Sequence, residues 1–200
     1  MSDYDPSWSG EWTADPAHTT IGFIARHAMV TRVGGAFDDV EVHIQVDAEQ
    51  PDRSSVRVRV GAASVNTRNQ QRDDHLRSAD FFDVERYPDI TFVSTSIEEI
   101  DQGGFVITGD LTIRGITKQI TVPVDFTGVA KDPFGEIRAG FEGRRRVNRR
   151  DFGLEWNVPL DAGGVLVSEK IELTYEVSAI KAPGGAGQDA GSRTDSTPGA

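Results

Sequence analysis

The feature that most constrains the fold of this chain is an alternation of apolar and polar residues with a period of two. Between residues 40 and 47, Val40, Val42, Ile44 and Val46 alternate with Glu41, His43, Gln45 and Asp47. The same alternation occurs in segments 56–60, 120–127 and 171–179. Successive side chains of a β-strand point to opposite faces, so each segment has one apolar and one polar face. The pattern is typical of antiparallel sheets.

Further candidate strands cover about 11–14, 20–27, 89–99, 104–113 and 137–147. Turn-forming sequences such as Gln50-Pro51-Asp52 and Arg114-Gly115 separate the strands. Short connections of this kind predict an up-and-down meander in which neighbours in sequence are neighbours in the sheet. About eight alternating strands whose edges need protection predict an all-β fold, an eight-stranded antiparallel closed barrel.

One polar segment breaks the alternation. Residues 67–78 are compatible with a helix, and Thr67 with Gln70 predicts a capping box at its start. We expect this helix to plug or flank one end of the barrel. The segment that follows, 79–88, contains the adjacent Phe81 and Phe82, and two such rings are costly unless they are buried. We therefore expect this segment to pack onto the barrel.

The length and composition favour a single domain. A chain of 200 residues can bury one sizeable core, whereas two domains would be cramped. We predict one domain over 10–181, preceded by a disordered segment, 1–9. The polar tail 182–200 has no aliphatic residue larger than Ala, so it is also predicted to be disordered.

Charge and cysteine content exclude several classes of protein. The 21 basic and 32 acidic residues give a formal net charge of −11, so no nucleic acid partner is expected. The absence of Cys excludes disulfides, thiolate metal sites and Cys nucleophiles. No stretch resembles a secretory signal or an apolar membrane-spanning helix. We expect a soluble cytoplasmic protein, with a mature periplasmic chain as the alternative.

Five stretches of the chain resemble a known family. They are DPAHT from Asp15, VGGAF from Val33, RDDHLRSADFFD from Arg72, GDLTIRGIT from Gly109 and NRRDFG from Asn148. On these residues the chain resembles the YceI-like family of lipocalin-like polyisoprenoid-binding proteins over roughly 11–181. The resemblance implies an extended, eight-stranded lipocalin-like barrel. It also implies an interior tunnel for an isoprenoid chain, such as the tail of a quinone or a prenyl diphosphate.

Aromatic residues on the apolar faces are the candidate walls of such a tunnel. They are Phe23, Phe37, Phe92, Phe126, Phe141 and Trp156. Phe81 and Phe82 join them as residues that close the barrel or meet the ligand. The alternative for all of them is a packed core, because an apolar pocket is lined by the same residue types.

A group of cationic side chains is a candidate for contacting a ligand head group. Arg68, Arg72 and His75 would share one helix face at the barrel mouth, toward an anionic or carbonyl group. The alternative is structural, with Arg72 and His75 holding the helix to the barrel while Asp73 pairs with Arg77.

The basic run 144–150 gives one further candidate. If its strand continues unbroken from Phe141, Arg145 points inward and is a ligand-binding candidate. The alternative is a solvated face that balances the acidic surface.

No signature of catalysis or metal binding accompanies these candidates. The spacing of the four histidines does not suit a metal site, and GxSxG, P-loop and paired-carboxylate motifs are absent. We therefore predict a non-enzymatic carrier, storage or sequestering protein for a polyisoprenoid lipid, without cofactor or metal. An enzyme of isoprenoid or quinone metabolism using Arg72, His75 and Arg145, and a ligand-free stress-related scaffold, remain the alternatives. Transient membrane contact and a homodimer are left open.

Overall fold

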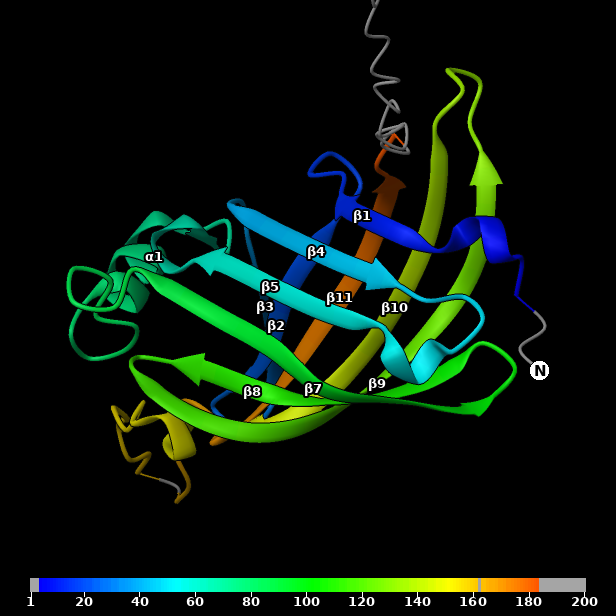
Figure 1. The fold of residues 1–200 in the computed structure, drawn as a ribbon. Coiled ribbons are helices and arrows are strands. Elements are labelled where there is room, and N and C mark those ends of the chain that lie inside the picture. Colours follow the sequence, from blue (N-terminus) through cyan, green and yellow to red (C-terminus); the bar gives the residue numbers. More distant parts are fainter. Residues whose placement is uncertain (1–3, 162, 184–200) are drawn as a thin grey trace, which may run out of the picture.

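The computed structural model describes residues 4–161 and 163–183, which form an antiparallel sheet closed into a barrel (Figure 1). Eight strands make the ring, in the order β1 (Gly10–Ala14), β4 (Val40–Val46), β5 (Ser55–Gly61), β7 (Asp89–Asp101), β8 (Gly104–Ile113), β9 (Ile116–Lys131), β10 (Ile137–Asn148) and β11 (Lys170–Lys181). Pairing of β11 with β1 closes it. The prediction of an eight-stranded antiparallel barrel is confirmed.

Three strands extend the sheet outside this ring. They are β2 (Thr20–His27), β3 (Thr31–Phe37) and β6 (Val65–Asn66). β11 pairs with β1 through residues 179–181 and with β2 through residues 172–176, so it changes partner along its length. The predicted meander therefore holds from β7 to β11, whereas β2 and β3 leave the ring between β1 and β4.

The strand β3 was not predicted from the sequence, because the adjacent Gly34 and Gly35 interrupt its pattern of apolar residues. Gly35 stands opposite Phe23 of β2. A Cβ at Gly35 would lie only 2.7 Å from Cζ of Phe23, so the ring of Phe23 occupies the space that a side chain on β3 would need. A glycine that leaves room for a neighbouring side chain cannot be recognised from the alternation of apolar and polar residues.

The only α-helix within the described residues, α1 (Gln70–Arg77), lies at one end of the barrel as expected (Figure 1). It is shorter than the predicted 67–78, and the predicted capping box is wrong. Asn69 is the N-cap, and its side chain accepts a hydrogen bond from the backbone N–H of Arg72 at 3.0 Å. Thr67 is instead buried, and its N–H and hydroxyl both donate to Asp73. No helix in the described ranges is long and apolar enough to cross a membrane.

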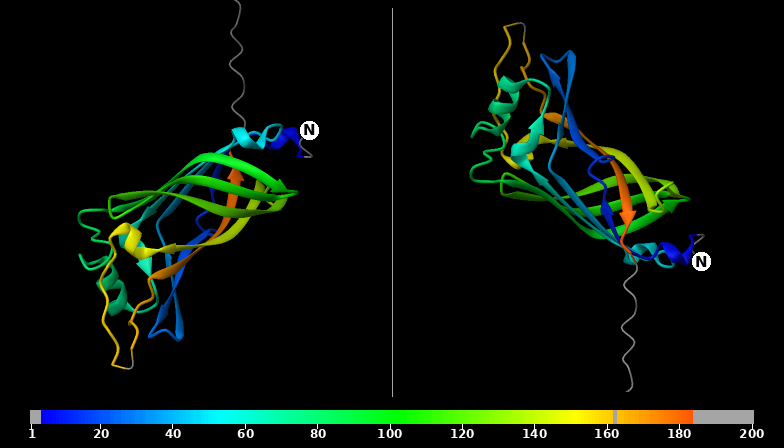
Figure 2. Two further views of the ribbon diagram at one scale, coloured as in Figure 1. Left: turned by 90° about the horizontal axis from the view of Figure 1, so that it is seen from below. Right: turned by 90° about the horizontal axis from the view of Figure 1, so that it is seen from above.

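The described residues also form four short 3-10 helices, namely η1 (Pro6–Trp8), η2 (Pro51–Arg53), η3 (Ala62–Ser64) and η4 (Arg149–Phe152). The core near α1 contains Phe81, Phe82, Phe152 and Leu154, so η4 lies at the same end as α1. At the other end, the N–H of Ala48 donates to Ser9, which joins the segment before η2 to η1. We call these two regions the α1 end and the η1 end; Figure 2 shows them on opposite sides of the barrel.

The prediction that residues 1–9 are disordered is wrong for residues 4–9. Asp5 caps η1, and Trp8 packs half-buried against the barrel core. Aromatic rings in a polar segment supply the apolar surface that its composition alone does not indicate. At the other terminus, the N–H of Ala182 donates to the carbonyl of Glu11 at 2.8 Å, so the barrel edge includes Ala182. The rest of the predicted tail, 184–200, lies outside the described residues.

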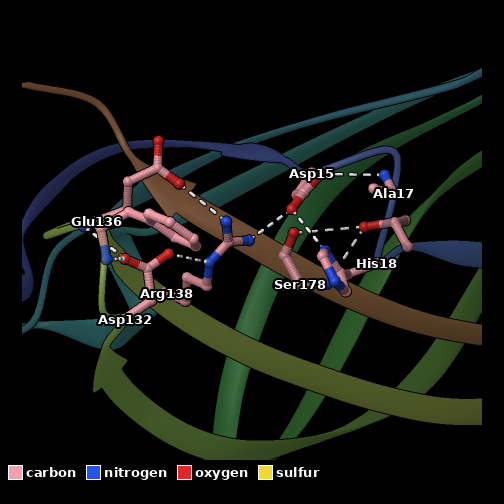
Figure 3. Close-up of polar contacts among 9 residues, drawn as sticks. Asp15, Ala17, His18, Asp132, Glu136, Arg138 and Ser178 are labelled. Atoms are coloured by element: carbon pink, nitrogen blue, oxygen red, sulfur yellow. Dashed lines mark hydrogen bonds and ion pairs between the residues drawn. The ribbon is translucent and has the colours of Figure 1, made fainter.

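A network of hydrogen bonds and ion pairs connects two segments on the outer surface of the barrel (Figure 3). The guanidinium of Arg138 on β10 donates to Asp15, Asp132 and Glu136. Asp15 also contacts the ring of His18 at 2.7 Å. These hydrogen bonds hold the pKa of Asp15 at about 2, below its ordinary value of 3.8. The network links the β1–β2 corner to the β9–β10 hairpin.

Candidate functional site

A cavity of about 340 Å³ occupies the interior of the barrel. All eight strands of the ring line it, together with β2 and β3, mostly through aliphatic and aromatic side chains. The lining follows from the sequence, because the apolar positions of each alternating strand are those that point inward. The size falls within the range of small-molecule pockets, about 300–1,000 Å³.

Most of the aromatic residues selected from the sequence meet at this cavity. Its lining includes Phe23, Phe37, Phe81, Phe82, Phe92, Phe126 and Phe141. Phe81 and Phe82 are only 5% and 9% exposed, which confirms that the segment after the helix packs onto the barrel. Trp156 lies outside the lining, where its ring contacts His75 and Phe81 at centroid distances of 4.5 and 5.4 Å. Contact of any of these rings with a ligand remains a prediction.

Six aromatic residues of the lining were not selected from the sequence. They are Tyr4, Trp8, Trp12, Phe105, Phe152 and Tyr175. The sequence pattern could have indicated Tyr175, because it belongs to the apolar face of an alternating segment, and Trp12 and Phe105 lie within candidate strands. No pattern indicated Tyr4 and Trp8, because they lie in the segment predicted to be disordered.

Tyr175 on β11 also connects the cavity wall at the point where β9 and β10 separate. The β9–β10 ladder ends at the pair Glu142 and Asp125. Beyond this pair, the hydroxyl of Tyr175 donates to the carbonyl of Pro123 on β9. The ring passes close to Gly143, where a Cβ would lie 2.5 Å from Cε2 of Tyr175. Burial raises the pKa of Tyr175, so its phenol is neutral and serves as a hydrogen-bond donor in the wall.

Arg145 does not line the cavity. It stands opposite Leu173, a cavity residue, as the inward register predicts. Its side chain is nevertheless exposed, because β9 does not pair with this part of β10. The structure therefore favours the solvated alternative for Arg145, and its role as a ligand contact stays a prediction.

Arg72 and His75 also lie outside the cavity lining. The guanidinium of Arg72 donates to the hydroxyl of Thr67 at 2.7 Å and to its carbonyl at 2.9 Å. His75 Nε2 lies 2.9 Å from a carboxylate oxygen of Asp80. Arg68 precedes α1 and is exposed, so the predicted shared helix face is not formed. The contacts of Arg72 and His75 favour the structural alternative.

The predicted pair of Asp73 with Arg77 is wrong. Asp73 is buried and accepts two hydrogen bonds from Thr67, as described above. Arg77 pairs with the exposed Asp74 at 2.9 Å and donates to backbone carbonyls of the η3–β6 segment. The short side chain of Asp73 thus fixes the turn before α1, and the long side chain of Arg77 fixes α1 to the barrel.

Aromatic rings also close the η1 end. The ring of Trp8 lies 5.8 Å from that of Phe126, and the ring of Tyr4 lies 6.1 Å from that of Phe105. The hydroxyl of Tyr4 donates to a carboxylate oxygen of Glu99 at 2.5 Å, and burial with this contact raises the pKa of Tyr4 to about 12. Tyr4 and Trp8 therefore form part of the cavity wall.

Comparison with known proteins agrees with this architecture. The model of the YceI-like domain matches residues 12–179. A UPF0312 protein of Staphylococcus aureus is 36% identical over 169 residues, which cover 84% of this chain and 95% of that protein. A UPF0312 protein of Azotobacter vinelandii is 35% identical over 164 residues, 82% of each chain.

Solved structures resemble the barrel as well. The crystal structure of the Campylobacter jejuni YCEI protein matches with a TM-score of 0.68 and 33% identity, over 92% of this chain and all of that one. A polyisoprenoid binding domain from Saccharophagus degradans, implicated in plant cell wall breakdown, matches with a TM-score of 0.61. It is 13% identical and covers 86% of this chain and 98% of that one, so it shows the fold alone. From its sequence match over 12–179 and its barrel, this chain belongs to the YceI-like domain family.

Proposed function

We propose that this protein binds a polyisoprenoid lipid in the barrel cavity and acts, without catalysis, as its carrier, storage or sequestering protein. The observation that carries the proposal is the apolar cavity of about 340 Å³ enclosed by the strands. The Saccharophagus degradans protein of the same fold is a polyisoprenoid binding domain, which supports the choice of ligand.

An apolar cavity suffices for affinity toward such a ligand. Each buried CH₂ contributes about 0.8 kcal/mol, so a five-carbon isoprene unit contributes on the order of 4 kcal/mol before ordering costs. A few units then give useful affinity without a charged contact. Branched prenyl chains also suit a wall in which aliphatic residues alternate with rings such as Phe92 and Phe141.

The cavity can be tested by filling it from one strand. Val58 on β5 lines the cavity, whereas the adjacent Arg57 is exposed and points to the other face. We compare Val58→Trp with Arg57→Trp, which add the same ring on opposite faces of one strand. Binding of farnesol, geranylgeraniol and a straight-chain alcohol of equal carbon number is followed by isothermal titration calorimetry.

The proposal predicts tighter binding of the longer prenyl chain and of the prenyl over the straight chain. Val58→Trp should weaken prenyl binding at least tenfold, while Arg57→Trp retains it. Equal binding to both variants would place the lipid outside the cavity. Failure of the wild-type protein to bind any of the three alcohols would favour the ligand-free scaffold, and turnover of a prenyl substrate would favour the enzyme.

A further inference from the structure

The β2–β3 hairpin ends in apolar side chains that are exposed to solvent. Met29 is 55% exposed and Val30 is 74% exposed. Backbone hydrogen bonds of 2.8 and 2.9 Å through Leu166 join Ala28 to Val158, which is itself 41% exposed and lies in the loop between η4 and β11. Met29, Val30 and Val158 therefore lie at one corner of the molecule, and we call them the apolar tip. Figure 2 shows the hairpin and the loop projecting together on the side of α1.

The turn holds Met29 exposed in a strained conformation. Ala28 and Met29 both have positive φ angles, 48° and 65°, and the N–H of Val30 donates to the carbonyl of His27 at 3.1 Å. Asn and Gly adopt such a turn readily, whereas other side chains are strained in it. Fold stability alone would therefore favour Asn and Gly here, and it does not account for an exposed Met29.

Cations lie beside the apolar tip on the outer face of the sheet. Arg26 and Arg32 stand opposite each other on β2 and β3. Arg144 and Arg146 continue this face on β10, and all four side chains are exposed. Of the described strand residues among them, one is acidic, Glu172. Its carboxylate contacts both Arg32, at 3.1 Å, and Arg146, at 3.6 Å, so the arginines are left in excess.

The charge of this face changes along the strands. Toward the tip, β11 begins with the exposed Lys170. Away from the tip, Glu142 stands opposite Glu176, which pairs with Thr20 at the start of β2. The cations thus gather beside the tip, although the whole chain has a net charge of −11. Salt screens charges beyond about 10 Å, so a surface that meets the tip interacts more with these cations than with distant acids.

Exposed apolar side chains flanked by cations are suited to an anionic lipid surface. Apolar side chains enter the boundary between head groups and acyl chains, while Arg and Lys attract anionic lipids. A nucleic acid would be bound by the cations and would leave the exposed aliphatic residues without a role.

We propose that the apolar tip docks this protein on an anionic membrane surface. Met29, Val30 and Val158 insert between the lipid head groups, and the arginines of β2, β3 and β10 contact the phosphates. This inference concerns the outer surface and does not depend on what the cavity holds. Because the tip lies on the side of α1, docking leaves the η1 end free.

The first test uses the wild-type protein. Co-sedimentation measures its binding to vesicles of equal parts phosphatidylcholine and phosphatidylglycerol, and to vesicles of phosphatidylcholine alone. Each cation near the surface strengthens binding about fivefold, so the anionic vesicles should bind at least tenfold more tightly. High salt should remove the difference, because it screens the charges. Equal binding to both vesicles would overturn the inference. Binding to neither would also overturn it and leave an acidic protein as the partner of this surface.

The second test separates membrane insertion from structural support. The double variant Ala28→Asn, Met29→Gly relieves the strained turn, so it should unfold at the same or a higher urea concentration than the wild type. It should nevertheless bind anionic vesicles several-fold more weakly. The double variant Arg144→Glu, Arg146→Glu should weaken this binding at least tenfold. Unchanged binding in either double variant would overturn the inference.

Matched controls place the same chemical changes elsewhere on the surface. Phe134→Ser removes a ring that is 91% exposed at the β9–β10 turn, and the double variant Arg53→Glu, Arg57→Glu reverses two exposed cations near and on β5. Both should bind anionic vesicles as the wild type does. Losses in the controls as large as those at the tip would show that the tip is not the docking surface.

An NMR measurement locates the contact without any substitution. Met29 is one of two methionines in the chain, so ¹³C labelling of methionine methyl groups reports on the tip. A spin-labelled lipid in anionic bicelles should broaden the Met29 signal, whereas neutral bicelles should leave it sharp. A Met29 signal that the anionic bicelles leave unchanged would overturn the inference, even if the variants do not fold.

Discussion

The two ends of this barrel are closed by different means. At the α1 end, Phe81, Phe82 and Phe152 are buried in one core, and α1 lies against it. At the η1 end, Trp8 belongs to one turn of 3-10 helix, and its ring and that of Phe126 are only half-buried above the buried Trp12. The rings that close the α1 end are thus packed as in a protein interior, whereas the outermost rings of the η1 end are packed as in a surface segment.

The buried polar groups follow the same division. Thr67, Asp73 and Arg149 are buried near α1 and η4, and their hydrogen bonds fix the segments that close this end. At the η1 end, the contacts that close the barrel are made by one segment, residues 4–9, and they break when this segment alone moves away from the barrel. Local opening requires the least free energy where few buried contacts are broken. We therefore expect fold stability to depend more on the α1 end and, on the proposed function, ligand exchange to take place at the η1 end.

The largest difference between the ends should come from one pair of substitutions. Phe81→Ala removes a fully buried ring and should lower the free energy of unfolding by about 3–5 kcal/mol. Phe126→Ala removes a half-buried ring and should cost about half as much or less. Urea denaturation of both variants, followed by tryptophan fluorescence, measures the difference. Equal losses would contradict the division between the ends.

The buried polar contact beside α1 should give the next largest effect. Asp73→Ala leaves the N–H and hydroxyl of Thr67 without their acceptor, which should cost about 1–3 kcal/mol. The matched control is Asp74→Ala, because Asp74 is exposed and its pair with Arg77 contributes about 0–1 kcal/mol. Thermal unfolding compares the two. A larger loss for Asp74→Ala would show that the buried contact does not stabilise this end.

Substitution of two tryptophans, one at each end, separates the rate of ligand exchange from the stability of the fold. Trp8→Ala removes ring contacts with Tyr4 and Phe126 at the η1 end, and should cost only about 1–2 kcal/mol. It should increase the dissociation rate of bound geranylgeraniol several-fold. Trp156→Ala at the α1 end is the control, and should lower stability without changing that rate. Faster release from Trp156→Ala than from Trp8→Ala, in stopped-flow measurements, would reverse the assigned roles.

The smallest effect concerns the outer network, which belongs to neither end. The pKa of Asp15 is held at about 2, so its stabilising contribution is present above pH 4 and lost as pH falls toward 2. Asp15→Asn should therefore be less stable than wild type at pH 7, and the difference should shrink between pH 4 and pH 2. Denaturation midpoints at both pH values test this. A difference that is independent of pH would show that the charge of Asp15 contributes nothing.

The regular part of the fold could be predicted because it depends on alternation. The segments around Val42, Val58 and Leu173 each carry a period-two pattern, and each is a strand of the ring. β3 could not be predicted in this way, because Gly35 contributes space instead of an apolar side chain. Residues 4–9 were wrongly predicted to be disordered, because composition averages over a segment. Their packing against the barrel core depends instead on the single ring of Trp8.

The candidate site was predictable to the same extent. Phe92 and Phe141 could be placed at the cavity because strand register decides which way they point. Arg149 could not, because the run of five arginines does not reveal which one is buried. Its position depends on η4 and on hydrogen bonds to the carbonyls of Leu154 and Ser168, which no pattern of apolar and polar residues encodes.

The most direct test of the account is the content of the cavity in the protein as the cell makes it. The protein is purified without detergent from its own host, and native mass spectrometry is followed by lipid analysis of an organic extract. We predict a stoichiometric adduct that carries a polyisoprenoid chain and is absent from Val58→Trp but present in Arg57→Trp. A ligand-free mass for the wild-type protein, or an adduct that Val58→Trp retains, would contradict the account.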